Sequence, residues 1–166
     1  MKRSYVIMAV VLILIVAGVG GYSYYEYSNT GRMAISVADL PISNVSAVYI
    51  TFTSVALHSN TSGWQNFTID KTVNIYDLTT SNASLLTNIS IHAGKYTMIR
   101  LYISNVSVKI LGTNVTFKLS APFAFINHPF TVSAHSTTGI IIEFELHSDL
   151  NLQSKIFTPY VGYVVS

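Results

Sequence analysis

The chain has 166 residues, of which 50% are hydrophobic and 10% charged, and it contains no cysteine. This length allows one domain behind an N-terminal segment, and the lack of cysteine excludes disulfides, thiolate metal sites, cysteine nucleophiles and an acylated-cysteine lipoprotein anchor. The formal net charge of +2 includes Lys2 and Arg3, which leaves a nearly neutral remainder, so no basic surface for nucleic acid is expected.

The N-terminal segment is predicted to be a membrane anchor. Its basic tip is followed by an apolar stretch with no charge from residue 4 to residue 25, and about 20 helical residues are enough to span a bilayer. We assign residues 1–4 to a cytoplasmic tip and 5–27 to a transmembrane helix, because basic residues stay on the cytoplasmic side. Four tyrosines would then lie at the outer interface, namely Tyr22, Tyr24, Tyr25 and Tyr27.

Two alternatives exist for this segment. A cleaved secretory signal also starts with basic residues and an apolar run, and Gly18, Gly20 and Gly21 supply small residues near its end. However, the apolar run is long for a signal, and an Ala-x-Ala cleavage site is missing. Processing after Ser4 by a prepilin-type peptidase would instead leave the helix as a filament core. All three interpretations export the rest of the chain.

Seven Asn-x-Ser/Thr triplets indicate N-glycosylation. With 11 Asn and 36 Ser or Thr in the chain, chance gives about 2.4 triplets, although strand turns are rich in these residues anyway. We predict that several triplets are glycosylated outside the cell, above all those of Asn60, Asn82 and Asn114, which are expected in loops. The candidate sites are Asn44, Asn60, Asn66, Asn82, Asn88, Asn105 and Asn114.

Strand patterns follow a short linker, which is predicted at residues 28–32. In the sequence TGIIIEFELH, Ile140, Ile142, Phe144 and Leu146 share one phase, and Glu143 and Glu145 take the other. This alternation predicts a half-buried antiparallel strand with its glutamates in solvent. Further strands are predicted at 33–38, 46–57, 64–69, 72–77, 129–134 and 157–165.

Three local features interrupt these strands. The phase of Ile99, Leu101 and Ile103 would carry Asn105 inward, so a bulge is expected near Ser104 and Asn105. LGTNV at 111–115 is typical of a hairpin turn. The stretch 80–88 is predicted to form one helical turn, with Ser81 or Asn82 as its cap and Leu85 and Leu86 packed against the sheet.

The expected fold is an all-β, antiparallel β-sandwich of immunoglobulin or transthyretin-like type. Seven to nine strands are predicted in an extracellular domain spanning 33–166, behind one N-terminal transmembrane helix.

The strand sequences carry a resemblance to a known family. The stretches DLPISNVSAVYITFTSVALH (39–58), TVNIYDLT (72–79), HAGKYTMIRLYISNVSV (92–108), HPFTVSAHSTTGIIIEFEL (128–146) and FTPYVGYVV (157–165) are the ones that carry it. On the basis of these stretches, the chain resembles the exported archaeal and bacterial domains known as domain of unknown function 4382, and the resemblance extends over about residues 33–165. The resemblance implies an exported, often membrane-anchored β-sandwich, and it implies no particular activity.

No catalytic, cofactor-binding or metal-binding residue is assigned. A metal site would need His128, His135 and His147 to converge with Asp149, and their spacing does not favour this. His58 and His92 are expected at strand ends or in loops. Glu143 and Glu145 are interpreted as one solvated strand face rather than an acid/base pair.

The aromatic residues are expected mainly in the core. Trp64 is predicted to be a core plug. The late aromatics are likewise expected to pack inside, although they would suit an exposed patch for a partner or for sugars. They are Phe123, Phe125, Phe130, Phe157, Tyr160 and Tyr163.

The sequence predicts a non-catalytic module of an archaeal cell surface. The protein would be a glycoprotein held in the membrane lipid bilayer, with its N-terminus in the cytoplasm and its C-terminal domain outside. This module would bind envelope components or other copies of itself, with no cofactor and no nucleic acid. One alternative is a pilin-like filament subunit. Another is an accessory single-helix subunit of a respiratory or sulfur-oxidising membrane complex.

Overall fold

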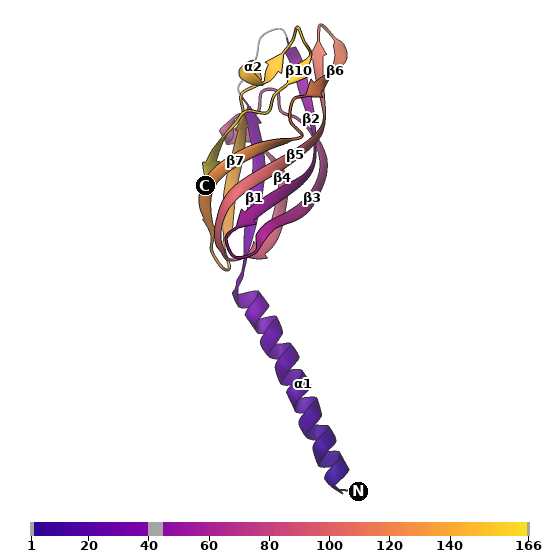
Figure 1. Cartoon of the computed structure of the whole chain (residues 1–166), viewed down its shortest axis with the longest axis vertical. Coiled ribbons are helices and arrows are strands. Elements are labelled where there is room, and N and C mark those ends of the chain that lie inside the picture. The colour runs from indigo at the N-terminus through magenta and orange to yellow at the C-terminus, as the bar shows by residue number, and fades with distance from the viewer. Residues whose placement is uncertain (1, 40–44, 166) are drawn as a thin grey trace.

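The computed structural model describes residues 2–39 and 45–165. Figure 1 shows one long helix projecting from the end of a β-sandwich, with the N-terminus at its far tip. The predicted glycosylation site Asn44 and residue Met1 of the predicted tip lie outside the described residues.

The helix α1 spans Lys2–Ser28. Its side chains from Ile7 to Tyr25 are exposed, and residues 7–28 are long and apolar enough to cross a membrane. A signal sequence would meet the same criteria of length and composition. The N-terminal helix therefore has the length and composition of a membrane anchor or a signal helix.

The predicted linker 28–32 is replaced by an almost direct junction, because α1 ends at Ser28 and strand β1 (Thr30–Asp39) begins two residues later. The polar residues that suggested a linker close the helix instead. The Asn29 backbone and side-chain N–H groups donate to the Tyr25 carbonyl at 3.2 and 3.1 Å, and the Thr30 hydroxyl donates to the Glu26 carbonyl at 2.6 Å.

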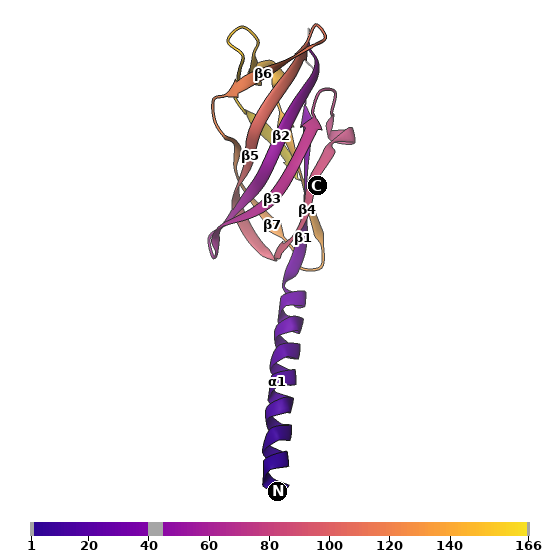
Figure 2. The same ribbon diagram turned by 90° about the vertical axis from the view of Figure 1, so that its right-hand side faces the viewer.

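The sandwich consists of two sheets (Figures 1 and 2). The smaller sheet has the order β11-β8-β1-β4, and the larger has the order β3-β2-β5-β6-β10-β9 with β7 paired to β5. The remaining strands are β2 (Val45–Ser59), β3 (Gly63–Asn74), β4 (Ser84–His92), β5 (Gly94–Ile110), β6 (Thr113–Leu119), β7 (Phe123–Val132), β8 (Thr137–Phe144), β9 (Leu150–Asn151), β10 (Ile156–Phe157) and β11 (Val161–Val165). Two short helices complete the list, namely η1 (Thr80–Asn82) and α2 (Leu146–Asp149).

The predicted all-β sandwich with one N-terminal helix is confirmed. The strand number differs, because the described residues hold eleven strands rather than seven to nine, including the two-residue strands β9 and β10. The pairing is also not purely antiparallel, since β1 runs parallel to β8 and β10 runs parallel to β6. β1 lies between β8 and β4 in the smaller sheet.

The core lies between the sheets and consists mainly of apolar side chains. Ile140, Ile142 and Phe144 of β8 are buried, as their phase predicted. The Phe144 ring meets Phe52 from β2 and Phe157 from β10, with ring centroids 6.0 and 6.2 Å apart. These three rings connect β8 of the smaller sheet to β2 and β10 of the larger one.

Two of the local predictions for β5 and β6 are confirmed. The register passes from Ile103 opposite Phe52 to Asn105 opposite Thr51, which leaves Ser104 as an extra residue and turns Asn105 outward. At the hairpin, Leu111 and Gly112 form a two-residue turn with φ values of 49° and 84°. Positive φ at both positions is the requirement of a tight hairpin turn.

Three other boundaries were predicted wrongly. The strands predicted at 64–69 and 72–77 form one strand, β3, which contains an irregularity where Asp70 adopts a φ of 49°. The strand predicted at 157–165 is divided between β10 and β11, and the one predicted at 129–134 is the end of β7. In each case a polar residue or a proline, which usually indicates the end of a strand, lies within or beside the strand, so the boundary was placed wrongly.

In the stretch 80–88, the predicted helical turn is limited to η1, and β4 begins at Ser84. The cap of this turn also differs from the prediction. Asn82 Oδ1 accepts hydrogen bonds from the Thr79 backbone N–H and, at 2.9 Å, from the Thr79 hydroxyl, so Asn82 closes the turn from its other end. Leu85 and Leu86 belong to strand β4, where they point to opposite faces: Leu86 enters the core and Leu85 is exposed.

Gly31 at the start of β1 is expected to tolerate no side chain. A Cβ atom there would lie 2.3 Å from the Ser133 carbonyl oxygen and 2.7 Å from Val132 Cγ1. Gly31→Ala should therefore lower the free energy of unfolding by about 1–3 kcal/mol, measured by denaturant unfolding of the full chain in detergent. Gly162→Ala is the matched control, because its Cβ would make only ordinary contact, 3.6 Å from Glu143. Equal stability of the two variants would contradict this packing.

Candidate functional site

The outer face of the larger sheet carries a continuous aromatic surface. Across strands β3, β2, β5 and β7, His58 lies opposite Trp64, Arg100 opposite Phe125, and Tyr102 opposite Phe123. Because alternate residues of a strand share a face, these side chains all point away from the core. We call this surface the Arg100 platform, which consists of His58, Trp64, Arg100, Tyr102, Phe123 and Phe125.

Arg100 lies at the centre of the platform. Its Cζ atom is 4.1 Å from the ring centroid of Trp64, 5.2 Å from that of Phe123 and 5.8 Å from that of Phe125. A guanidinium within about 6 Å of an aromatic face is attracted by the ring. Three rings therefore hold the Arg100 side chain in one place.

The platform is fixed by further contacts between its side chains. The His58 ring packs on Trp64 with centroids 5.0 Å apart, and its Nδ1 is 2.8 Å from the Thr97 hydroxyl. Tyr102 meets the edge of Phe123 at 5.4 Å. These contacts connect all four strands, so the rings are held in place before any ligand arrives.

The charge of Arg100 is not neutralised within the described part of the chain. There, the ion pairs within 4 Å are limited to His92 with Glu26, at 3.9 Å. The Arg100 Nε is buried without a hydrogen-bond partner in the described structure. The platform therefore presents an oriented cation that can accept a carboxylate, sulfate or phosphate.

The prediction that Trp64 is a core plug is wrong, because Trp64 shares the outward phase of Asn66 and Thr68. The alternation of Trp64 with these two polar residues could have predicted that Trp64 points outward. The late aromatics are divided: Phe130 and Phe157 are buried, whereas Phe125 is 43% exposed and Phe123 lies on the platform. Arg100 was missed, although its neighbours Ile99 and Leu101 on the buried phase predict that it points outward.

The remaining two late aromatics lie elsewhere. Tyr160 is exposed, and Tyr163 on β11 packs against His128 with ring centroids 4.5 Å apart.

The five histidines lie apart from one another. His58 belongs to the platform, His92 pairs with Glu26, His128 packs on Tyr163 and His135 packs on Tyr27. His147 lies in α2 beside the buried Asp149. Within residues 2–39 and 45–165, no group of three or more potential ligands is arranged to hold a metal ion.

Asp149 is buried at the end of the sandwich that is distant from α1. Its Oδ1 accepts the Tyr160 backbone N–H at 2.9 Å, and its carbonyl accepts that of Thr158 at 2.8 Å. Burial raises the pKa of Asp149 to about 7, with smaller raising contributions from Glu145 and Asp39 and lowering contributions from backbone hydrogen bonds. This carboxyl group fastens the chain after β10.

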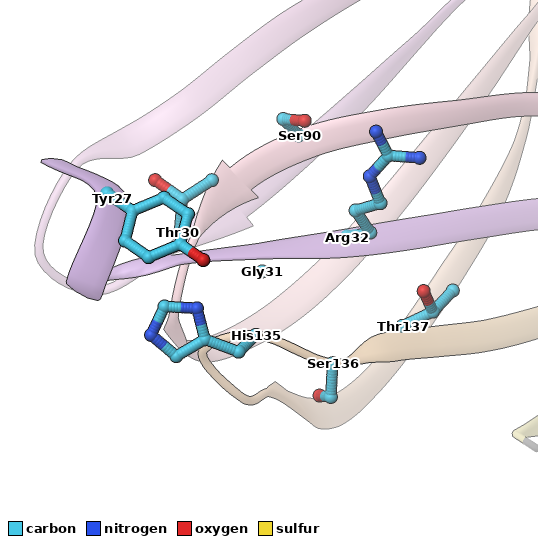
Figure 3. A pocket seen from close by; sticks show the side chains of 8 residues that line it. All are labelled: Tyr27, Thr30, Gly31, Arg32, Ser90, His135, Ser136 and Thr137. Atoms are coloured by element: carbon cyan, nitrogen blue, oxygen red, sulfur yellow. The ribbon is translucent and has the colours of Figure 1, made fainter.

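A cavity of about 450 Å³ lies at the junction of α1 and the sandwich. Figure 3 shows Tyr27 and His135 at one end of it, Arg32 and Thr137 at the other, and Gly31 between them. The complete lining is Tyr27, Thr30, Gly31, Arg32, Ser90, His135, Ser136 and Thr137. We call it the junction cavity.

The triplet asparagines within the described residues are all exposed. They lie in the β2–β3 turn, in β3, in η1, in β4, beside the bulge of β5 and in β6, and they are Asn60, Asn66, Asn82, Asn88, Asn105 and Asn114. Asn114 therefore lies in a strand just after the hairpin turn, not in a loop as expected. Glycosylation of these residues remains a prediction.

The fold and the platform define a helix-bearing β-sandwich with an outward cationic and aromatic surface. A family model described as a domain of unknown function (DUF4382) matches residues 30–159. The chain therefore belongs to this family, as its strand sequences suggested. The matched region starts with β1 and excludes α1.

Similarity beyond the family is low. No curated protein matches the chain. One similar solved structure is described as a "putative cell adhesion protein from Bacteroides ovatus ATCC 8483". The two chains share 5% identity with a TM-score of 0.26, and the match covers 83% of this chain and 44% of the other. This chain thus spans less than half the length of that protein, and the likeness carries no functional argument.

Proposed function

We propose that the protein is a non-catalytic, membrane-anchored module of the cell surface that binds an acidic glycan of the envelope through the Arg100 platform. The observation that carries this proposal is the Arg100 guanidinium, held among three aromatic rings with no carboxylate within 4 Å in the described part of the chain. The arrangement resembles a recognition surface, because arginine and aromatic side chains are the usual anchors of interfaces.

The chemistry of the platform favours a ligand with both acidic and flat apolar parts. A guanidinium pairs most strongly with a carboxylate or sulfate group. The exposed Phe125 ring offers an apolar face beside it, and the C–H faces of sugar rings stack on such rings. A polysaccharide with carboxylate or sulfate groups supplies both kinds of contact.

The anchor supports the cell-surface location. α1 leads into β1 through Asn29 alone, so an α1 in the bilayer would hold the sandwich directly at the membrane surface. Tyr22, Tyr24, Tyr25 and Tyr27 are exposed near the helix end, where an aromatic belt would mark the outer interface. The proposed orientation has the N-terminus in the cytoplasm and the sandwich outside.

The exposure of the triplet asparagines supports glycosylation of this outer domain. Asn66 is a special case, because it lies two residues from Trp64 on the same strand face. A glycan on Asn66 would compete with a ligand for the platform, so we expect Asn66 to be the least occupied of these sites.

The proposal is tested by binding of the full chain, in nanodiscs of neutral lipid, to dextran sulfate, polygalacturonate and neutral dextran. We expect the two acidic polymers to bind and neutral dextran not to bind. Arg100→Gln should weaken binding at least about tenfold, as expected for loss of a charge-assisted contact of about 1.5–3 kcal/mol. Arg100→Lys should retain only part of the wild-type affinity, because lysine keeps the positive charge but lacks the planar group that stacks on the rings.

Lys118→Gln is the matched control, because it removes the same charge from an exposed position on β6 of the same sheet. Equal losses in the Arg100 and Lys118 variants would show general charge attraction and would contradict a site on the platform. A hydrolytic or redox activity that disappears with one His or Glu substitution would contradict the non-catalytic assignment.

A further inference from the structure

We propose that the junction cavity binds the phosphate group of a membrane lipid headgroup, and so fixes the sandwich on the bilayer surface. This inference rests on the membrane anchoring of α1 proposed above, and it concerns a different surface from the Arg100 platform. Three properties of the cavity carry it: its position, its charge and its rigidity.

The position follows from Tyr27. This residue is in the last turn of α1 and also lines the cavity. If α1 spans the bilayer, the interfacial tyrosines of residues 22–27 lie at the level of the headgroups. The cavity beside Tyr27 then opens at the depth of the lipid phosphates.

The lining has the composition of an anion site. Arg32 provides a permanent positive charge, and the His135 ring provides an N–H group that can donate to an anion. Hydroxyl groups surround them, and none of the eight lining residues is acidic. The nearby Glu26 carboxylate faces His92 at 3.9 Å and does not line the cavity. The Thr30 and Ser136 hydroxyls already donate to the Glu26 and Ser133 carbonyls, at 2.6 and 3.1 Å. The hydroxyl donors left for an anion are therefore those of Tyr27, Ser90 and Thr137.

The walls of the cavity are held by backbone hydrogen bonds. The His135 N–H donates to the Thr30 carbonyl at 3.0 Å, and the Arg32 N–H donates to the Ser136 carbonyl at 2.8 Å. On the other side, the Ala93 N–H donates to the Asn29 carbonyl at 2.6 Å. The loops before β5 and β8 therefore hold both sides of the junction.

His135 is held in an unfavourable conformation at this place. Its φ is 57°, in the left-handed region that non-glycine residues rarely adopt. The imidazole packs on the Tyr27 ring with centroids 4.9 Å apart. Strain of this kind is retained where the surrounding contacts impose it, often at ligand sites, and here it places the imidazole against the end of the anchor.

The lipid arm of the test uses native mass spectrometry of the full chain in detergent. The protein is offered an equimolar mixture of phosphatidylglycerol and a neutral galactolipid with the same acyl chains. We expect one retained phosphatidylglycerol, in at least fivefold preference over the galactolipid. Arg32→Gln should abolish this preference, and His135→Asn, which keeps a residue tolerant of positive φ, should weaken it.

Lys109→Gln is the matched control, because Lys109 is exposed and lies by the β5–β6 hairpin, at the end of the sandwich far from α1 (Figures 1 and 2). Its lipid preference should equal that of the wild type. No preference in the wild-type protein, or the same loss in the Lys109 and Arg32 variants, would overturn the proposal.

A second arm distinguishes a lipid from a soluble ligand. Inorganic phosphate is titrated into the protein in detergent without phospholipid, and the NMR signals of His135 are followed. If phosphate shifts these signals while phosphatidylglycerol shows no preference, the cavity serves a soluble anion and the lipid proposal is wrong. Membrane anchoring by α1 is tested separately by flotation of the full chain with neutral liposomes, because binding to these liposomes requires no phosphate site. This experiment distinguishes a failure of the anchor from a failure of the cavity.

Discussion

Phe144→Ala is expected to lower the free energy of unfolding by about 3–5 kcal/mol, the usual cost of removing a buried phenylalanine ring. Phe144 is fully buried, and its ring contacts Phe52 and Phe157. The substitution would leave a cavity where both sheets meet. Guanidinium unfolding of the full chain in detergent, followed by far-UV circular dichroism, measures the effect.

Phe125→Ala is the matched control for this experiment, because it makes the same chemical change at a side chain that is 43% exposed on the outer face. Its cost should be at most about 1 kcal/mol. If the two variants were equally unstable, the core would not lie between the sheets at Phe144.

The second large effect is a fall in stability as pH rises from about 4 to about 7. The pKa of Asp149 is raised from 3.8 to about 7 in the folded protein. Between these values the folded state holds a proton that the unfolded chain has lost, so the free energy of unfolding decreases with pH and levels off above 7. The loss is up to about 4 kcal/mol, at about 1.4 kcal/mol per pKa unit.

Asp149→Asn should remove this pH dependence and make the protein more stable than the wild type at pH 8. The amide keeps an oxygen for the Tyr160 N–H and carries no charge to bury. Asp77→Asn is the control, since Asp77 is exposed and its positive φ of 63° suits asparagine. Denaturant midpoints at pH 4, 6 and 8 are to be compared. An unchanged slope in the Asp149 variant would contradict this assignment.

The sequence predicted those parts of the fold in which a local pattern determines the structure. The alternation of Ile140, Ile142 and Phe144 identified the buried face of β8. The conflict of phase around Ser104 identified the bulge. In both cases the information lies within a few consecutive residues, where a strand has a period of two.

The boundaries that failed depend on pairing between distant strands. Asp70 interrupts the apolar pattern, yet β3 continues through it because β2 supplies hydrogen bonds on both sides of the irregularity. Similarly, Leu85 joins β4 because it pairs with Ser36 of β1, and Leu86 is the extra residue at the point where that register shifts. A single sequence does not contain the register that decides these cases.

The platform was only partly predictable for the same reason. The phases of Trp64 and Arg100 place both side chains outside the core, but their contact requires the alignment of β3, β2 and β5. The burial of Asp149 depends likewise on the path of the chain around Tyr160. By contrast, the junction cavity exists because α1 passes almost directly into β1. The polar residues near Asn29 predicted a linker at this place, so the sequence did not indicate the cavity.

The central claim is that the protein stays anchored by α1 and displays a glycosylated, independent sandwich outside the cell. It is tested most directly by purification from native membranes in mild detergent, with the intact mass measured together with any accompanying proteins. We predict a mass that includes α1 and added glycans, without a stoichiometric partner. A processed chain in a polymer would indicate a filament subunit. An unmodified chain locked to cofactor-bearing subunits would indicate an accessory subunit, and either result would contradict the claim.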